Sequence, residues 1–141
     1  MAARFPLIVD GSGTPAIKEI VSGDVLDLTG LQVKLGTEAT LTDGATVAWD
    51  VSASPIAKLT LGGNRTLSAP TNAVGSGQYI SLLVIQDGTG SRTLTWNAAY
   101  EFKDDTAPTL TTTASKGDIF TFRYNGSKWL EVGRNQNLTL S

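Results

Sequence analysis

Short segments of alternating apolar and polar residues make up most of the chain after residue 45. Threonine and β-branched residues fill these segments, and glycines separate them at short intervals. Alternation with a period of two places the apolar side chains on one face of a strand. The segments lie at 46–51, 56–61, 65–68, 78–87, 92–97, 118–124 and 127–133. Short strands with Gly-rich turns predict an all-β fold, an antiparallel β-sandwich or jelly-roll-like domain.

Three of these segments lead to more specific predictions. Residues 78–87 are apolar at consecutive positions, which is typical of a central strand covered on both faces. Asn125-Gly126, which follows 118–124, is the pair preferred in type I′ turns, so this part predicts a β-hairpin. Gly62-Gly63-Asn64 predicts another hairpin, between 56–61 and 65–68.

The first 45 residues show a different pattern. Short apolar pieces alternate with Gly- and Asp-containing loops, and the segment has little room for a core of its own. We therefore expect an extended N-terminal arm or docking module at 1–45 and a β-sandwich domain at 46–141. The apolar residues predicted to dock this arm on a partner surface are Phe5, Leu7, Val9, Ile17 and Ile20.

The residue content excludes several kinds of catalytic and metal-binding site. The chain has no His and no Cys, which excludes Ser-His and Cys-His catalytic pairs and thiolate metal sites. The net charge of −2 provides no electrostatic reason to bind nucleic acid. The N-terminus is not a signal peptide, and no apolar stretch reaches the roughly 18 residues of a membrane span. We expect a binding protein rather than an enzyme, with no cofactor.

Acidic residues offer two alternatives. Asp104 and Asp105 could coordinate Ca²⁺, but their spacing matches no EF-hand loop and equally suits a solvated loop. Glycoside hydrolysis needs two carboxylates about 5–10 Å apart, and nothing in the sequence brings any two together. The carboxylates considered for it are Glu38, Glu101 and Glu131. We expect neither a metal site nor a hydrolase.

Aromatic residues could stack on sugar rings or fill the core. The alternating patterns around Trp96 and Trp129 favour the core or a subunit contact, and Trp49 is open to both interpretations. Tyr79 and Tyr100 lie near predicted loops. The predicted exposed binding surface consists of Tyr79, Tyr100, Asp104 and Asp105.

Several stretches resemble virion structural proteins of tailed bacteriophages. RFPLIVD (4–10), IKEI (17–20) and SGDVLDL (22–28) look like the start of many phage tail-fibre and related proteins. LGGNRTLSAPTN (61–72), IQDGTGSRTLTW (85–96) and DIFTF (118–122) with KWL (128–130) are similar to a β-domain of phage fibre and decoration proteins. The resemblance covers most of the chain. It implies a homotrimer, made in the host bacterial cytoplasm and attached to the outer surface of the virion by its N-terminal piece.

The resemblance leads to two functional hypotheses. Fibres normally carry a long shaft, whereas here the arm runs straight into one β-domain that ends at Ser141. We therefore favour a trimeric capsid decoration (cement) protein that binds the major capsid protein and stabilises the outer head. The alternative is a short tail-fibre or receptor-binding protein that attaches to tail or baseplate proteins and contacts host surface carbohydrate. A polysaccharide-degrading enzyme is disfavoured by the lack of His.

Overall fold

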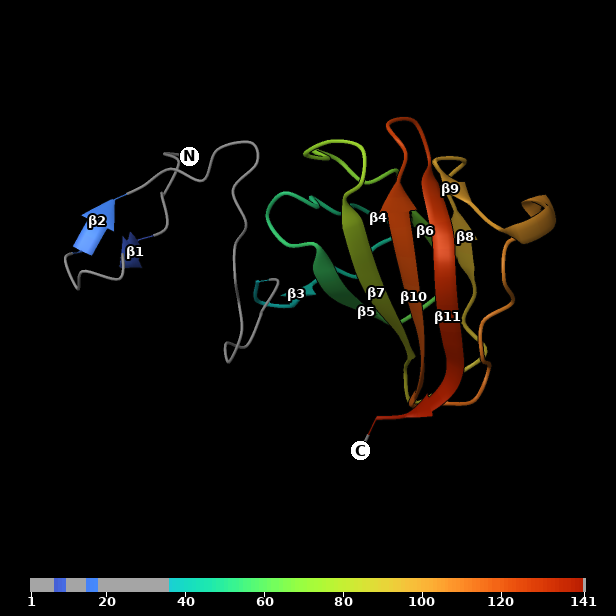
Figure 1. Cartoon of the computed structure of the whole chain (residues 1–141). Helices are drawn as coiled ribbons and strands as arrows, with labels where there is room; N and C mark the ends of the chain where they lie inside the picture. The colour runs from blue at the N-terminus through green and yellow to red at the C-terminus, as the bar shows by residue number, and fades with distance from the viewer. Residues whose placement is uncertain (1–6, 10–14, 18–35, 141) are drawn as a thin grey trace. The chain divides into compact units, whose positions relative to one another are not determined.

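The computed structural model describes residues 7–9, 15–17 and 36–140. The chain divides into two units, Met1–Val33 and Lys34–Ser141. In the first unit, β1 (Leu7–Val9) pairs antiparallel with β2 (Pro15–Ile17), with Leu7 opposite Ile17 (Figure 1). Leu7, Val9 and Ile17 of the predicted arm therefore lie in a two-stranded sheet. Phe5 and Ile20 lie outside the described residues.

The second unit contains two sheets and confirms the all-β, sandwich-like prediction (Figure 1). The six-stranded sheet has the order β3 (Ala39–Thr40), β5 (Ile56–Leu61), β7 (Tyr79–Gln86), β10 (Lys116–Tyr124), β11 (Trp129–Thr139) and β9 (Tyr100–Glu101). The three-stranded sheet has the order β4 (Thr46–Val47), β6 (Arg65–Leu67) and β8 (Leu94–Trp96). A short 3₁₀ turn, η1 (Lys103–Asp105), follows β9. Strand β3 lies within the segment predicted to be the arm.

From β3 to β8, successive strands alternate between the two sheets. We call each strand of the six-stranded sheet, together with the strand that follows it in the other sheet, a coil; the coils are β3–β4, β5–β6 and β7–β8. Each connection crosses to the other sheet, so strands of successive coils run parallel. Strands β10 and β11 then extend the larger sheet as an antiparallel hairpin beside β7. The sandwich therefore has mixed sheets.

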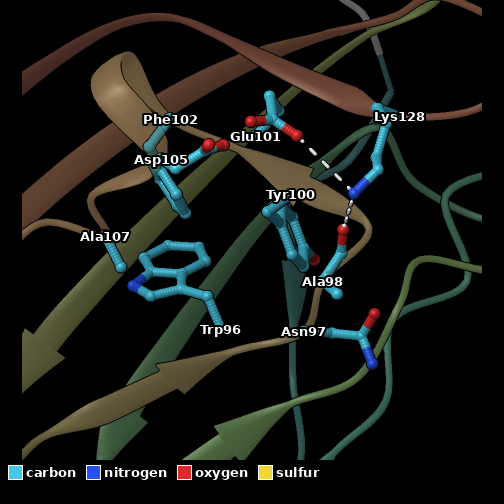
Figure 2. A pocket seen from close by; sticks show the side chains of 9 residues that line it. All are labelled: Trp96, Asn97, Ala98, Tyr100, Glu101, Phe102, Asp105, Ala107 and Lys128. Atoms are coloured by element: carbon cyan, nitrogen blue, oxygen red, sulfur yellow. Dashed lines mark hydrogen bonds and ion pairs between the residues drawn. The ribbon is translucent and has the colours of Figure 1, made fainter.

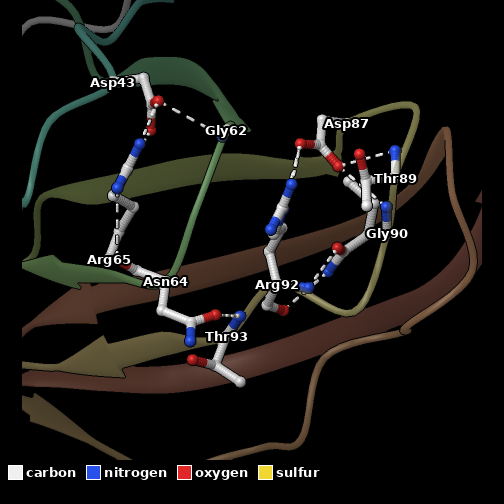
Figure 3. A network of polar contacts seen from close by, with 10 residues as sticks. Asp43, Gly62, Asn64, Arg65, Asp87, Thr89, Gly90, Arg92 and Thr93 are labelled. Carbon is white, nitrogen blue, oxygen red and sulfur yellow. Dashed lines mark hydrogen bonds and ion pairs between the residues drawn. The ribbon is translucent and has the colours of Figure 1, made fainter.

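The predicted hairpin across Gly62-Gly63-Asn64 is wrong, because β5 and β6 belong to different sheets. The turn is held by its neighbouring coils instead of by a strand pair (Figure 3). The Gly62 N–H donates to the Asp43 carboxylate of the preceding turn, and the Asn64 side chain accepts a hydrogen bond from the N–H of Thr93 in the following turn. Alternating residues and glycines are found both in hairpins and in turns that cross from one sheet to the other. Here the contacts with the neighbouring coils stabilise the crossing turn.

The core lies between the two sheets. Strand β7 shows the period of two clearly, because Ile80, Leu82 and Val84 are buried while the residues between them are only partly covered. The largest side chains of the core come from both sheets and the segments between strands: Trp49, Leu59, Leu61, Leu67, Phe120, Phe122 and Trp129. The prediction that 78–87 is covered on both faces is therefore wrong within the described unit. The strand is central in its sheet, but only its inner face meets a second layer.

The predicted hairpin at 118–133 is confirmed, with β10 and β11 paired antiparallel. Its turn is not type I′, since a type I′ turn needs positive φ at both central residues and only Gly126, at 100°, has it in the loop 125–128. The Asn125 side chain accepts hydrogen bonds from the N–H groups of Ser127 and Lys128, at 2.9 and 2.7 Å. These bonds stabilise a four-residue loop without left-handed backbone at Asn125. Strand β11 also continues beyond the predicted end, to Thr139.

Candidate functional site

A hollow of about 250 Å³ lies where the end of β8 meets β9, η1 and the start of β11 (Figure 2). Strand β8 contributes Trp96 and β9 contributes Tyr100 and Glu101, while Asp105 comes from η1. Lys128 reaches the same place because β9 pairs in parallel with β11, which begins one residue later. The hollow thus combines three aromatic rings, including that of Phe102, with two carboxylates and one ammonium group.

The Trp96 ring is held by edge-to-face aromatic contacts. Its centroid lies 5.3 Å from that of Tyr100, 5.2 Å from Phe102 and 5.0 Å from Phe120, with interplanar angles of 73°, 71° and 71°. Such contacts are each worth about 0.5–1.5 kcal/mol beyond simple burial. The wall of the hollow is therefore rigid, and the rings that hold Trp96 belong to the core.

Two polar atoms of this aromatic group are buried without a hydrogen-bond partner in the described part of the chain: Trp96 Nε1 and the Tyr100 hydroxyl. Tyr100 is only 5% exposed, and its burial raises the pKa of the phenol far above its usual range. The hydroxyl therefore stays protonated and can donate a hydrogen bond. A buried polar group left unpaired costs about 1–3 kcal/mol, so these two atoms carry an energetic cost within the folded domain.

Charged groups lie at the edge of the hollow (Figure 2). Lys128 Nζ donates to the carbonyl oxygen of Ala98 and lies 3.5 Å from a carboxylate oxygen of Glu101. Asp105 adds a second carboxylate. The side chains that line the hollow therefore carry a formal charge of −1, and the ammonium group of Lys128 already interacts with Glu101.

The predicted exposed surface does not form a single site. Asp105 and Tyr100 line the hollow, but Tyr100 is buried rather than exposed, because pairing of β9 with β11 places its ring against Phe122 and Trp96. Asp104 is exposed in η1, beside Lys103. Tyr79 lies on β7 and is 52% exposed, where it borders an apolar groove. The expectation had not included Trp96 or Lys128; the density of aromatic residues at 96–102 was the available signal.

The three glutamates considered for hydrolysis each lie beside a cation. Glu38 is 3.3 Å from Lys58, Glu131 is 2.7 Å from Arg134, and Glu101 interacts with Lys128 as described. Within the described ranges, no group of three or more His, Cys, Asp or Glu side chains could hold a metal ion. No helix in the described part of the chain is long and apolar enough to cross a membrane.

A second candidate surface is the outer face of the six-stranded sheet, the face turned away from the core. Leu83 of β7 lies between Lys58 of β5 and Ile119 of β10 in the strand register. The apolar residues on this face include Ile56, Tyr79, Leu83, Ile85, Ile119 and Val132. Two hollows of about 320 and 330 Å³ lie on it, one bordered by Ile56 and Tyr79 and the other by Ile119 and Val132. An apolar surface of this kind is typical of an interface.

Residues 37–129 match the family model described as "Putative phage tail fibre C-terminal domain". The chain belongs to this family. The match covers about two-thirds of the chain and includes all the residues named for the hollow. It confirms the resemblance to phage virion structural proteins and specifies the tail-fibre type. No curated protein and no solved structure matches the chain.

Proposed function

We propose that this tail-fibre domain protein is a non-enzymatic part of the phage tail that contacts the host cell surface. The observation that carries the proposal is the family match over 37–129, which spans both sheets up to the first residue of β11. This match favours the tail-fibre hypothesis over the capsid decoration that the sequence first suggested. Binding, rather than turnover, also suits a site whose carboxylate Glu101 is engaged by Lys128.

Self-association through the outer face of the six-stranded sheet is the second part of the proposal. Leu83 and Ile119 are adjacent on that face, and Val132 is 57% exposed. Burying apolar surface contributes roughly 25 cal/mol per Å², so a few hundred Å² in each subunit would contribute several kcal/mol before ordering costs. We propose that three such faces meet around a three-fold axis, in the homotrimer that the resemblance implies.

The N-terminal unit is proposed to attach the subunit to other tail proteins. Its described strands, β1 and β2, have three residues each. A pair of such short strands contributes little stability by itself, which supports docking on a partner surface. Leu7, Val9 and Ile17 lie in these strands and are the apolar residues proposed to make that contact.

Antibody labelling of phage particles in the electron microscope tests the proposed location. We expect label on the tail only. Label over the whole head would contradict the tail-fibre proposal and support capsid decoration. As a functional test, purified full-length protein should compete with intact phage for host cells and reduce adsorption. Unchanged adsorption at saturating protein would contradict the proposed host contact.

A further inference from the structure

We infer that Val132 of one subunit inserts into the apolar hollow beside Ile56 and Tyr79 of a second copy of the chain. The inference rests on the proposed self-association and adds to it the residues that meet. Three features of the outer face of the six-stranded sheet carry it: a row of small side chains, a β-bulge at one end of the row and an apolar hollow at the other.

The row of small side chains crosses the outer face from strand to strand. Ser81 of β7 lies opposite Thr121 of β10, and Thr121 lies opposite Gly133 of β11. Ile56 of β5 lies opposite Ser81 and ends the row on the other side. The neighbouring rows carry larger side chains: Tyr79 and Arg123 on one side, Leu83 and Ile119 on the other. The row is therefore a shallow trough, and Thr121 lines the hollows at both of its ends.

Val132 stands at the β11 end of this trough because of a β-bulge. The register of β10 and β11 shifts between Thr121, which lies opposite Gly133, and Phe122, which lies opposite Glu131. Val132 is the extra residue, and a bulge of this kind redirects a side chain from the regular pleat. Val132 is 57% exposed, and a Cβ at the adjacent Gly133 would meet nothing within 4 Å. Val132 therefore forms a small apolar knob with open space beside it.

The hollow at the β5 end of the trough suits such a knob. It has a volume of about 320 Å³, and its exposed lining is almost entirely apolar. The lining residues are Pro55, Ile56, Tyr79, Ile80, Ser81 and Thr121, none of which is charged. An aliphatic side chain that enters this hollow removes apolar surface from water on both partners.

The knob and the hollow lie at the same level along the strands. Ile56 and Gly133 are the two ends of one row, and Val132 precedes Gly133. Rotation about an axis parallel to the strands keeps every residue at its own level. A subunit related by such a rotation therefore presents its Val132 to this hollow without any shift along the axis, and closed rotational symmetry is usual in assemblies of identical chains.

The area of the outer face favours three copies over two. The apolar part of the face spans β5, β7, β10 and β11 and the residues from Tyr79 to Ile85, so it measures roughly 20 by 20 Å. Two such faces together would bury about 800 Å² and three about 1,200 Å², whereas stable interfaces bury roughly 1,200–2,000 Å². The contact is therefore placed between the subunits of the proposed trimer.

Disulfide cross-linking of the full-length protein tests the inference, because the chain has no cysteine of its own. The test variant combines Ile56→Cys with Val132→Cys. Within one subunit, β5 and β11 are three strand spacings apart, about 14 Å, which is beyond the roughly 7 Å between Cα atoms that a disulfide can span. We expect mild oxidation to shift the protein from one-chain to three-chain mobility in a denaturing gel, and reductant to reverse the shift.

Matched variants exclude other contacts. Thr60→Cys with Val132→Cys uses an exposed position on the same face of β5, four residues further along, and should give no cross-link. Val132→Cys alone should also remain one chain, and a two-chain product would overturn the inference because Val132 would then meet its own copy. Ser81→Cys with Val132→Cys probes the other wall of the hollow with a nearly isosteric change, in case Ile56→Cys lowers the melting temperature. A two-chain product from either hollow pair, or no product from both, would overturn the inference.

Light scattering and particle labelling separate this inference from the proposed function. Trimers that form no cross-link in either hollow pair would leave self-association in place and contradict this contact. Three-chain products together with label over the head would leave the contact in place and contradict the tail location. A monomer at all concentrations would overturn both the self-association and the contact.

Discussion

Arg65 connects two successive coils, because its guanidinium group donates two hydrogen bonds of 2.7 Å to the Asp43 carboxylate, one from Nε and one from Nη2 (Figure 3). The pair is bidentate, and the Asp43 carboxylate also accepts from the N–H of Gly62. Bidentate pairs of this kind fix geometry as well as contributing energy.

Arg65→Ala should therefore lower the melting temperature modestly and loosen the turn at 62–64. Thermal melts with hydrogen exchange at 62–66 would show it; exchange there as slow as in the unchanged protein would contradict the role. Arg123→Ala, an exposed arginine on β10, is the control.

Acid should weaken the turns that carry aspartates. The hydrogen bond from Arg65 holds the pKa of Asp43 below its ordinary value of 3.8, and Arg92 does the same to the pKa of Asp87. A carboxyl group whose pKa is lower in the folded state contributes stability above its unfolded pKa and loses it as the pH falls through the folded pKa. The melting temperature should therefore be flat above about pH 5 and fall below pH 4. Asp43→Asn should show a shallower fall, and an equally steep fall would contradict the assignment.

The buried carboxylate of Asp118 connects three segments. It is 2% exposed and accepts hydrogen bonds from the N–H groups of Thr111 and Asn137, at 2.7 and 2.9 Å, and from the Gln136 side chain at 3.3 Å. Asp118→Ala would leave the Thr111 N–H without its acceptor, while the Asn137 N–H keeps the Thr111 hydroxyl oxygen at 3.0 Å, so we expect a loss of about 1–3 kcal/mol in the free energy of unfolding. Urea denaturation measures it, with the exposed Asp104→Ala as control. A loss below about 1 kcal/mol would show that these N–H groups find other acceptors.

Gly90 allows two loops to pack closely. Its φ is +75°, and a Cβ there would lie 2.5 Å from the Thr112 carbonyl oxygen and 2.8 Å from Ala114 N. Both neighbours are backbone atoms, which cannot move aside without shifting the loop. Gly90→Ala should therefore cost about 1–3 kcal/mol of unfolding free energy. At Gly88, two residues earlier, an added Cβ meets nothing within 4 Å. Gly88→Ala should be neutral or slightly stabilising, and equal effects at the two glycines would contradict this explanation.

The outer face of the six-stranded sheet should control self-association. Val132 lies on this face and is 57% exposed, so Val132→Asp would place a charge in the proposed interface while leaving the core intact. We expect light scattering to show a trimer for the unchanged protein and a monomer for the variant, with similar melting curves at low concentration. Val74→Asp, in a loop and 78% exposed, should remain trimeric. A monomer in the unchanged protein would contradict self-association, and a trimer in Val132→Asp would exclude this face.

The pattern of apolar residues determined the strands and their buried sides. The prediction at 56–61 coincides with β5, and Phe120 and Phe122 of β10 are buried while Thr121 between them is only partly covered. The preference for alternation is local, because it depends only on the two sides of a single strand. For the same reason, alternation does not say which strand lies beside which. That part of the prediction went wrong at Gly62-Gly63-Asn64, where contacts from Asp43 and Thr93 make a coil turn.

The hollow at Trp96 shows the same division. The sequence by itself determined that Trp96 and Tyr100 are four positions apart along the chain, and that no His or Cys takes part. Only the tertiary structure decided that Tyr100 is buried and that Lys128 stands beside Glu101. Both results follow from the parallel pairing of β9 with β11, a contact between segments almost thirty residues apart. Such pairings depend on the sum of core packing over the whole domain, and no local pattern of residues records that sum.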